Sequence, residues 1–242
     1  MAMKGSRKHV LELIDNPDFI SIMNKTLFPF DVVLEDKKTL QPKGFIDSSE
    51  FRLQRYANEH KLVNTFPNLK GFNFNKWWNP NGGSAPTWDL ISLCKLNGKD
   101  ALLLVEAKAH TSEFDTYGKK EKDNPSDGSI ANRINIEKRI KEACDNLNIS
   151  TNGFNVSINK HYQLSNRVAF SWKLNQLNIP VVLLYLGFTG DNYFKDYFTD
   201  KIHWEKEFKH YLEGVVPFSF LNSSSSEFLF IHSSIPIQGG RK

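Results

Sequence analysis

The sequence has few cysteines, no long apolar run and no strong excess of charge of either sign. Its two cysteines, Cys94 and Cys144, are too few for a disulfide framework and lack the spacing of a zinc site. The longest apolar run, Ile179–Phe188, is about ten residues long, which is too short to span a bilayer. The first residues are charged and lack the apolar stretch of a signal peptide. We therefore expect a cytoplasmic protein with no membrane association.

Charge and composition leave the function open. The net charge is only +4, from 31 Lys and Arg against 27 Asp and Glu, which permits a polyanionic partner without requiring one. The sequence shows no zinc-finger spacing, no convincing helix-turn-helix and no strong basic stripe. Apolar residues make up 40% of the chain and aromatic residues 13%, which is enough for a sizeable core. We therefore expect residues 1–242 to form a single domain.

The order of the periodic segments predicts an α/β domain with a mixed central sheet flanked by helices. These segments are, in chain order, a helix from Ile46, a strand over Gly71–Trp78, a hairpin around Asn97-Gly98, helices from Ser129 and His161, and a buried strand at Ile179–Gly187. We interpret about 46–188 as the core of the domain. Residues 1–45 and 189–242 are then additions to it.

The dipeptide Asn97-Gly98 lies between two apolar runs, which is the strongest short-range signal for a β-hairpin because both residues tolerate positive φ. If these two residues form the turn, counting outward places Asp89 opposite Glu106. Lys108, two residues beyond Glu106, shares that face of the sheet. A four-residue loop would keep the shared face, whereas a bulge would break it. The hairpin therefore predicts that three ionisable groups meet at one end of an apolar strand pair.

Two carboxylates this close repel each other, so one of them takes up a proton unless a cation lies between them. Their hard oxygens suit Mg²⁺, which typically binds one or two carboxylates together with water and substrate phosphate. The amine of Lys108 beside such an ion can orient or deprotonate a water molecule, or stabilise charge on a phosphate. The alternative is a surface Glu–Lys pair of little energetic consequence. That alternative explains less well why the charges appear only where the apolar run ends.

Asp89 followed by Glu106-Ala107-Lys108 resembles the PD…(D/E)xK motif of the restriction-endonuclease-like nuclease superfamily, with Pro86 three residues before the aspartate rather than adjacent to it. The predicted elements of the core resemble the α-β-β-β-α-β order of that superfamily. The resemblance implies a nuclease that hydrolyses phosphodiester bonds, usually in DNA. It implies that Mg²⁺ or Mn²⁺ is bound by Asp89, Glu106 and the backbone carbonyl of Ala107, with Lys108 as the catalytic lysine.

Four further residues are weaker candidates for the site. Superfamily members often carry a glutamate on the first helix, and Glu50 is the nearest candidate, although a capping box with Asp47 also explains it. Gln163 and Arg167 lie one turn apart on a predicted helix, where many members place a residue that faces the site, so both are candidates for binding the substrate; an exposed polar face is the alternative. His110 shares the face of the motif and could assist at the metal or contact the substrate, or be an ordinary residue at the edge of the sheet.

The sequence thus favours a metal-dependent endonuclease acting on DNA, and it is compatible with a homodimer. Two alternatives stay open. One is a catalytically silent nucleic-acid-binding protein of the same fold. The other is a nuclease that acts on RNA or on branched DNA, because no residue pattern in the chain identifies the substrate.

Overall fold

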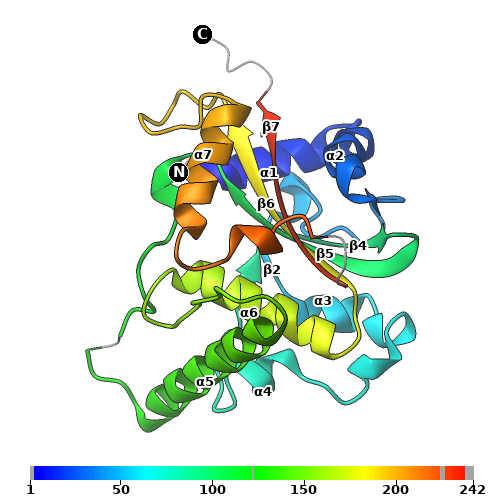
Figure 1. Ribbon diagram of the computed structural model, residues 1–242. Helices are drawn as coiled ribbons and strands as arrows, with labels where there is room; N and C mark the ends of the chain where they lie inside the picture. Colours follow the sequence, from blue (N-terminus) through cyan, green and yellow to red (C-terminus); the bar gives the residue numbers. More distant parts are fainter. Residues whose placement is uncertain (1–2, 122, 224–226, 238–242) are drawn as a thin grey trace.

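A mixed five-stranded sheet runs through the middle of the molecule (Figure 1). The computed structural model describes residues 3–121, 123–223 and 227–237. The strands, in sheet order, are β1 (Val32–Val33), β4 (Leu90–Leu96), β5 (Lys99–Lys108), β6 (Val181–Thr189) and β7 (Phe228–Pro236). Neighbours from β1 to β5 are antiparallel and neighbours from β5 to β7 are parallel. The prediction of an α/β domain with a mixed central sheet flanked by helices is therefore confirmed.

Helices cover both faces of this sheet. One face packs against α1 (Gly5–Asp15) and α2 (Phe19–Leu27). The other face packs against α3 (Leu53–Glu59), α4 (Phe74–Trp78), α5 (Asp127–Ser150), α6 (Tyr162–Gln176) and α7 (Lys201–Leu212). A second, two-stranded sheet joins β2 (Phe51–Arg52) to β3 (Thr87–Trp88). Short 3-10 helices fill connections at Phe28–Phe30, Phe45–Asp47, Leu62–Asn64, Pro67–Leu69, Thr111–Glu113 and Phe218–Phe220.

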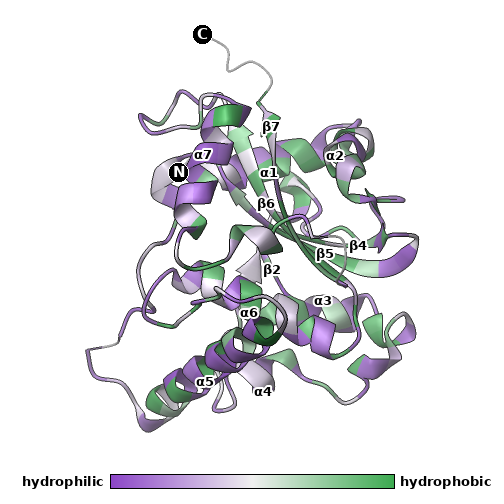
Figure 2. Cartoon of the chain, viewed as in Figure 1, coloured by the Kyte–Doolittle hydropathy of each residue, from purple (hydrophilic) through white to green (hydrophobic). Residues whose placement is uncertain are grey.

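The strands of the central sheet are largely hydrophobic because both of their faces are buried (Figure 2). Along β5, alternate residues enter different cores: Leu102 and Leu104 pack with α6, whereas Leu103 and Val105 pack with α1 and α2. This alternation continues to the end of the strand. Across the described ranges, every helix is too short or too polar to span a lipid bilayer.

The predicted two-residue turn at Asn97-Gly98 is confirmed. Leu96 pairs with Lys99, and the φ angles of Asn97 and Gly98 are 50° and 79°. The ladder then runs without a bulge to the pair of Leu90 with Val105. This register fixes which side chains of β4 and β5 share a face.

The predicted strand over Gly71–Trp78 is wrong, because this segment contains the short helix α4. The side chain of Asn73 caps the helix by accepting a hydrogen bond from the backbone N–H of Lys76. Helical geometry lets both tryptophans of the segment pack against Phe170, whereas a strand would point them to opposite faces. The third antiparallel strand is supplied instead by β1, from much earlier in the chain.

The predicted helix from Ile46 begins only at Leu53. The residues before it form a 3-10 turn and the strand β2, in which Phe51 pairs with Trp88. The capping box of Asp47 and Glu50 is therefore absent, since Glu50 directly precedes a strand. Burial of Phe51 against the segment that leads to Asp89 accounts for the strand.

The described residues within 1–45 and 189–242 contribute to the sheet and to its covering layers. The first segment supplies α1, α2 and β1, and the last supplies α7 and β7. Val10, Phe19 and Met23 of the first segment are buried against the sheet.

Gly187 on β6 pairs with Lys108 and lies beneath Trp204 of α7, where an added Cβ would overlap the indole ring. We predict that Gly187→Ala lowers the free energy of unfolding by about 1–3 kcal/mol, because the ring must move within a packed core. Urea unfolding measures this change. The control is Gly128→Ala in the first turn of α5, where the nearest atom is 3.6 Å from the added Cβ and alanine favours the helix. Equal losses in the two variants would contradict the proposed contact.

Candidate active site

Asp89, Glu106 and Lys108 come together at the end of the β4–β5 hairpin that lies away from its turn. Glu106 and Lys108 continue the alternation of β5 on the face that packs with α6. The β4 ladder ends at Leu90, so Ala107 has no β4 residue opposite it. Its backbone N–H donates instead to Asp89 Oδ2, at 2.8 Å. The Asp89 side chain thus takes the place of a backbone acceptor in the ladder.

The same hydrogen bond indicates where the carbonyl of Ala107 points. In an extended strand, the N–H and C=O of one residue point to the same side. Because the N–H of Ala107 points to Asp89, its carbonyl lies on the side of β5 from which Asp89 approaches. The carbonyl, Asp89 and Glu106 are the three oxygen donors that the motif predicted.

Glu106 is only 2% exposed and is held between two cations. Its Oε1 accepts from Lys108 Nζ at 2.7 Å, and its Oε2 accepts from Arg167 Nε at 2.7 Å. Burial alone would raise the pKa of Glu106, but the charges of Arg167 and Lys108 outweigh burial and lower it. The Glu106 carboxylate is therefore ionised at neutral pH.

Arg167 of α6 is buried, and each nitrogen of its guanidinium donates a hydrogen bond within the protein. Nη2 donates to the Thr87 carbonyl at 2.7 Å, Nη1 donates to Asn166 at 2.8 Å, and the group stacks over the Trp88 ring at 4.4 Å. Arg167 thereby ties Glu106 to the strand that leads into Asp89. These contacts give Arg167 a positioning role at Glu106.

Gln163 lies one turn before Arg167 on α6 and, as expected from that spacing, faces the same cluster. Its Oε1 accepts from Lys108 Nζ at 2.8 Å. Lys108 is therefore held between Glu106 and Gln163. Lys108 is 4% exposed, whereas Gln163 is partly exposed and forms the solvent side of this contact.

Glu50 and His110 occupy different surroundings. Glu50 is exposed, accepts a hydrogen bond from the Thr87 hydroxyl, and lies close enough for its charge to act on the pKa of Asp89. It thus borders the cluster without belonging to a helix. His110 stacks on Phe194 at 4.0 Å between ring centroids. Within the described part of the chain, His110 makes no hydrogen bond or ion pair with the three central residues.

Two tyrosines beside Glu106 were not anticipated from the sequence. Tyr185 pairs with Glu106 across β5 and β6, and Tyr211 comes from α7. Burial raises the pKa of both phenols, and the charge of Glu106 raises each further. Both are therefore neutral at physiological pH. Only the register between two parallel strands distant in sequence could have identified Tyr185.

The pKa of Asp89 lies well above its ordinary value. Burial raises its pKa to about 7, and the negative charge of Glu106 adds to the effect, while Lys108 and the Ala107 N–H oppose it. Asp89 is therefore part-protonated at neutral pH. A cation beside its carboxylate would favour the ionised form.

The oxygen donors of this cluster fit a divalent cation that keeps several water ligands. Among the described residues, no three His, Cys, Asp or Glu side chains are grouped so as to hold a metal by themselves. Mg²⁺ needs only one or two carboxylates, and Asp89 Oδ1 has no hydrogen-bond partner within the described ranges. Burial and the charge of Glu106 raise the pKa of Asp89 more than the charge of Lys108 lowers it, so a further cation beside this carboxyl would stabilise its ionised form. Both oxygens of Glu106 already bind cations, so a metal would share this carboxylate.

Comparison with known proteins finds no matching family model, no matching curated protein and no matching solved structure. The resemblance to the nuclease superfamily therefore rests on the residues of the site and on the order of the elements.

The raised pKa of Asp89 predicts a pH-dependent stability. Between about pH 4 and 7, folded Asp89 holds a proton that the unfolded chain has lost, so its contribution to stability falls as the pH rises through this range. We expect Asp89→Asn to melt close to the wild-type temperature at about pH 5 and above it at about pH 8, by calorimetry in EDTA. Mg²⁺ should reduce the difference in melting temperature between the variant and the wild type at about pH 8. A difference in melting temperature that does not change with pH would contradict the raised pKa of Asp89.

The buried pair of Glu106 and Arg167 predicts strong energetic coupling. Arg167→Met leaves Glu106 with one cation, so we expect it to lower the free energy of unfolding by about 3–5 kcal/mol. The double variant with Glu106→Gln should lose less than the sum of the single losses. As a control, Arg139→Met removes a partly exposed pair with Glu142 and should cost about 1 kcal/mol or less. Additive losses would show that the pair is not coupled.

Proposed function

We propose that this protein is a metal-dependent nuclease of the restriction-endonuclease-like type that hydrolyses phosphodiester bonds in DNA. The observation that carries the proposal is the hydrogen bond from Ala107 to Asp89, because it brings the separate aspartate directly to the Glu-Ala-Lys segment. The order of elements supports the same core: helices α1 and α2, the antiparallel strands β1, β4 and β5, helices α5 and α6, and then β6 parallel to β5. In this assignment β1 takes the role that we first gave to Gly71–Trp78.

Asp89, Glu106 and the carbonyl of Ala107 would hold Mg²⁺ or Mn²⁺. When bound, such an ion lowers the pKa of a water molecule and offsets charge on the phosphate. Lys108 donates hydrogen bonds from a buried position and would stabilise the charge that develops on the scissile phosphate. Gln163 holds the amine of Lys108 in place, and Arg167 holds the carboxylate of Glu106.

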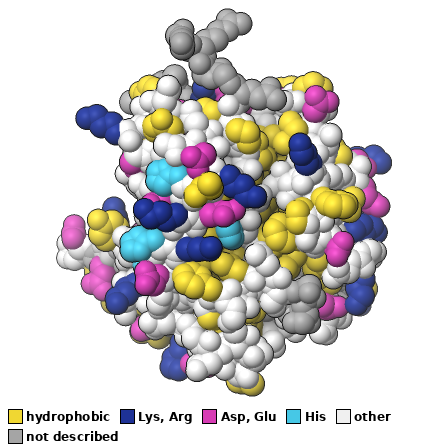
Figure 3. Space-filling view, turned by 45° about the horizontal axis from the view of Figure 1, so that its top comes forward, with side chains coloured by type: hydrophobic (Ala, Val, Ile, Leu, Met, Phe, Trp, Pro, Cys, Tyr) yellow, Lys and Arg dark blue, Asp and Glu magenta, His cyan; other side chains and the backbone are white. Residues whose placement is uncertain are grey.

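A polar cavity near the start of α5 supports a polyanionic substrate. Its volume is about 670 Å³, and its lining includes Lys120 and Arg133 together with Glu121 and Glu137, of which Glu121 pairs with Arg133 at 3.1 Å. Cations at such a place bind phosphate groups by releasing counterions. The surface elsewhere is mixed: on the face shown in Figure 3, Lys and Arg side chains are interspersed with Asp and Glu.

One observation favours a second candidate function, a nucleic-acid-binding protein without catalysis. Both oxygens of Glu106 are bonded to cations, as in a structural ion pair. A carboxylate so neutralised binds a metal more weakly than a free one. The proposed nuclease acts on DNA; RNA and branched DNA are alternative substrates of the same site.

The proposed chemistry predicts loss of Mn²⁺-dependent cleavage in Asp89→Asn, Glu106→Gln and Lys108→Met. Each change removes a donor that acts on the phosphate or the metal, so we expect the rate to fall by at least about a hundredfold. Gel assays on plasmid, linear duplex, single-stranded and branched DNA and on RNA, with EDTA as blank, measure it.

Lys99→Met is the matched control, because Lys99 lies at the other end of the same strand and pairs with Glu227 on the surface. Its cleavage rate should equal that of the wild type. Retained cleavage in all three site variants would exclude this site. No cleavage of any substrate by the wild type would favour the binding protein.

A further inference from the structure

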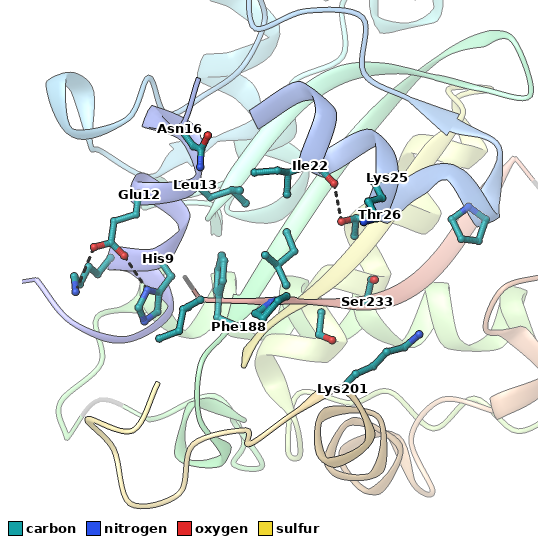
Figure 4. Close-up of a pocket in the computed structure, with 16 residues that line it drawn as sticks. His9, Glu12, Leu13, Asn16, Ile22, Lys25, Thr26, Phe188, Lys201 and Ser233 are labelled. Carbon is teal, nitrogen blue, oxygen red and sulfur yellow. Dashed lines mark hydrogen bonds and ion pairs between the residues drawn. The ribbon is translucent and has the colours of Figure 1, made fainter. Parts of the chain in front are cut away.

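A cavity of about 620 Å³ lies beside α1, α2 and the ends of β6 and β7 (Figure 4). Phe188 lines it and belongs to the core on the α1 side of the sheet, whereas Glu106 and Lys108 face the α6 side. The cavity is therefore on the opposite face of the sheet from the candidate active site. Its volume is in the range of small-molecule sites, and α/β folds bind ligands beside the carboxyl ends of parallel strands.

The inner part of this cavity is apolar. Figure 4 shows Leu13 of α1, Ile22 of α2 and Phe188 of β6 directed into the same space. Ile235 of β7 adds a further aliphatic surface. Such a lining accepts the ring or branched chain of an organic molecule, because it removes apolar surface from water.

The rim of the cavity is cationic. Lys8, Lys25 and Lys201 line it, and Glu12 is its acidic side chain. Glu12 already forms an ion pair with Lys8 at 3.3 Å and also bonds to His9. Lys25 has no ion-pair partner within the described residues, and Lys201 has only a long contact of 3.7 Å with Glu205. Positive charge is therefore left for an anionic group of a ligand.

Hydrogen bonds fix one wall of the cavity in place. His9 is 5% exposed, and its ring nitrogens lie 2.9 Å from Glu12 Oε2 and 2.7 Å from Asp191 Oδ2. The ring also packs near Phe188, with 5.4 Å between ring centroids. This arrangement ties α1 to the loop after β6. The cavity is thus largely formed before a ligand arrives, which reduces the entropy lost on binding.

We propose that this cavity binds a small organic anion, with an apolar ring or branched chain over Phe188 and one anionic group at Lys25 and Lys201. The anionic group is a carboxylate or a phosphate. The site is separate from the proposed nuclease chemistry and uses none of its residues.

The experiment uses the full-length protein and 1-anilinonaphthalene-8-sulfonate, a fluorescent ring system with one anionic group. We expect one dye molecule to bind per chain at native conditions, as measured by fluorescence titration. Reversing both rim charges, in Lys25→Glu combined with Lys201→Glu, should weaken binding at least about tenfold. The control Lys206→Glu reverses an exposed charge on the same helix as Lys201 and should leave binding unchanged.

A second variant and a neutral dye separate the contribution of the apolar lining from that of the rim charges. Ser233→Trp fills the cavity and should abolish binding, while circular dichroism confirms that each variant is folded. N-phenyl-1-naphthylamine, which lacks the anionic group, should bind the wild type and the charge-reversed variant equally. Unchanged sulfonate binding in both variants, or none to the wild type, would overturn the proposal.

Competition with phenyl phosphate and with 3-phenylpropionate identifies the anionic group. Displacement of the dye by only one of them assigns a phosphate or a carboxylate, and displacement by both supports a site for either. Displacement by neither would contradict the ligand class.

Discussion

The buried carboxylate of Glu106, shared between Lys108 and Arg167, is the interaction on which the candidate site depends. A charge this deep in a protein is tolerated only when it is paired and hydrogen-bonded. Each of its partners also contacts a second group. Lys108 reaches Gln163, and Arg167 reaches the Thr87 carbonyl, just before Asp89. The pairing of one carboxylate therefore sets the positions of the other groups.

In this arrangement, Asp89 is the carboxylate of the cluster whose negative charge is least compensated. The two cations lie against Glu106, and the Ala107 N–H engages only Oδ2 of Asp89. Burial and the neighbouring carboxylate then raise the pKa of Asp89 to about 7. A divalent cation would stabilise the charged form of buried Asp89 and offset its repulsion from Glu106. This is the physical reason for proposing a cation here.

The sequence was sufficient for the hairpin because the turn residues and the strand period are local rules. Asn97-Gly98 set the register, and the register brought Asp89, Glu106 and Lys108 to one place. Helical spacing likewise placed Gln163 and Arg167 on one side of α6. What local rules missed depends on tertiary packing: α4 formed where both tryptophans could pack on Phe170. The pairing of β2 with β3 put Glu50 next to a strand, not a helix.

The alternation of β5 also separates two potential functions across the sheet. One set of its side chains ends in Glu106 and Lys108, and the other set supports the core below the cavity at Phe188. The most direct test of the central claim is a titration with Mn²⁺ followed by electron paramagnetic resonance, which counts free and bound ions. The account predicts saturable binding by the wild type and by His110→Ala, strongly weakened in Asp89→Asn. Equal binding by the wild type and Asp89→Asn, or none by the wild type, would contradict it.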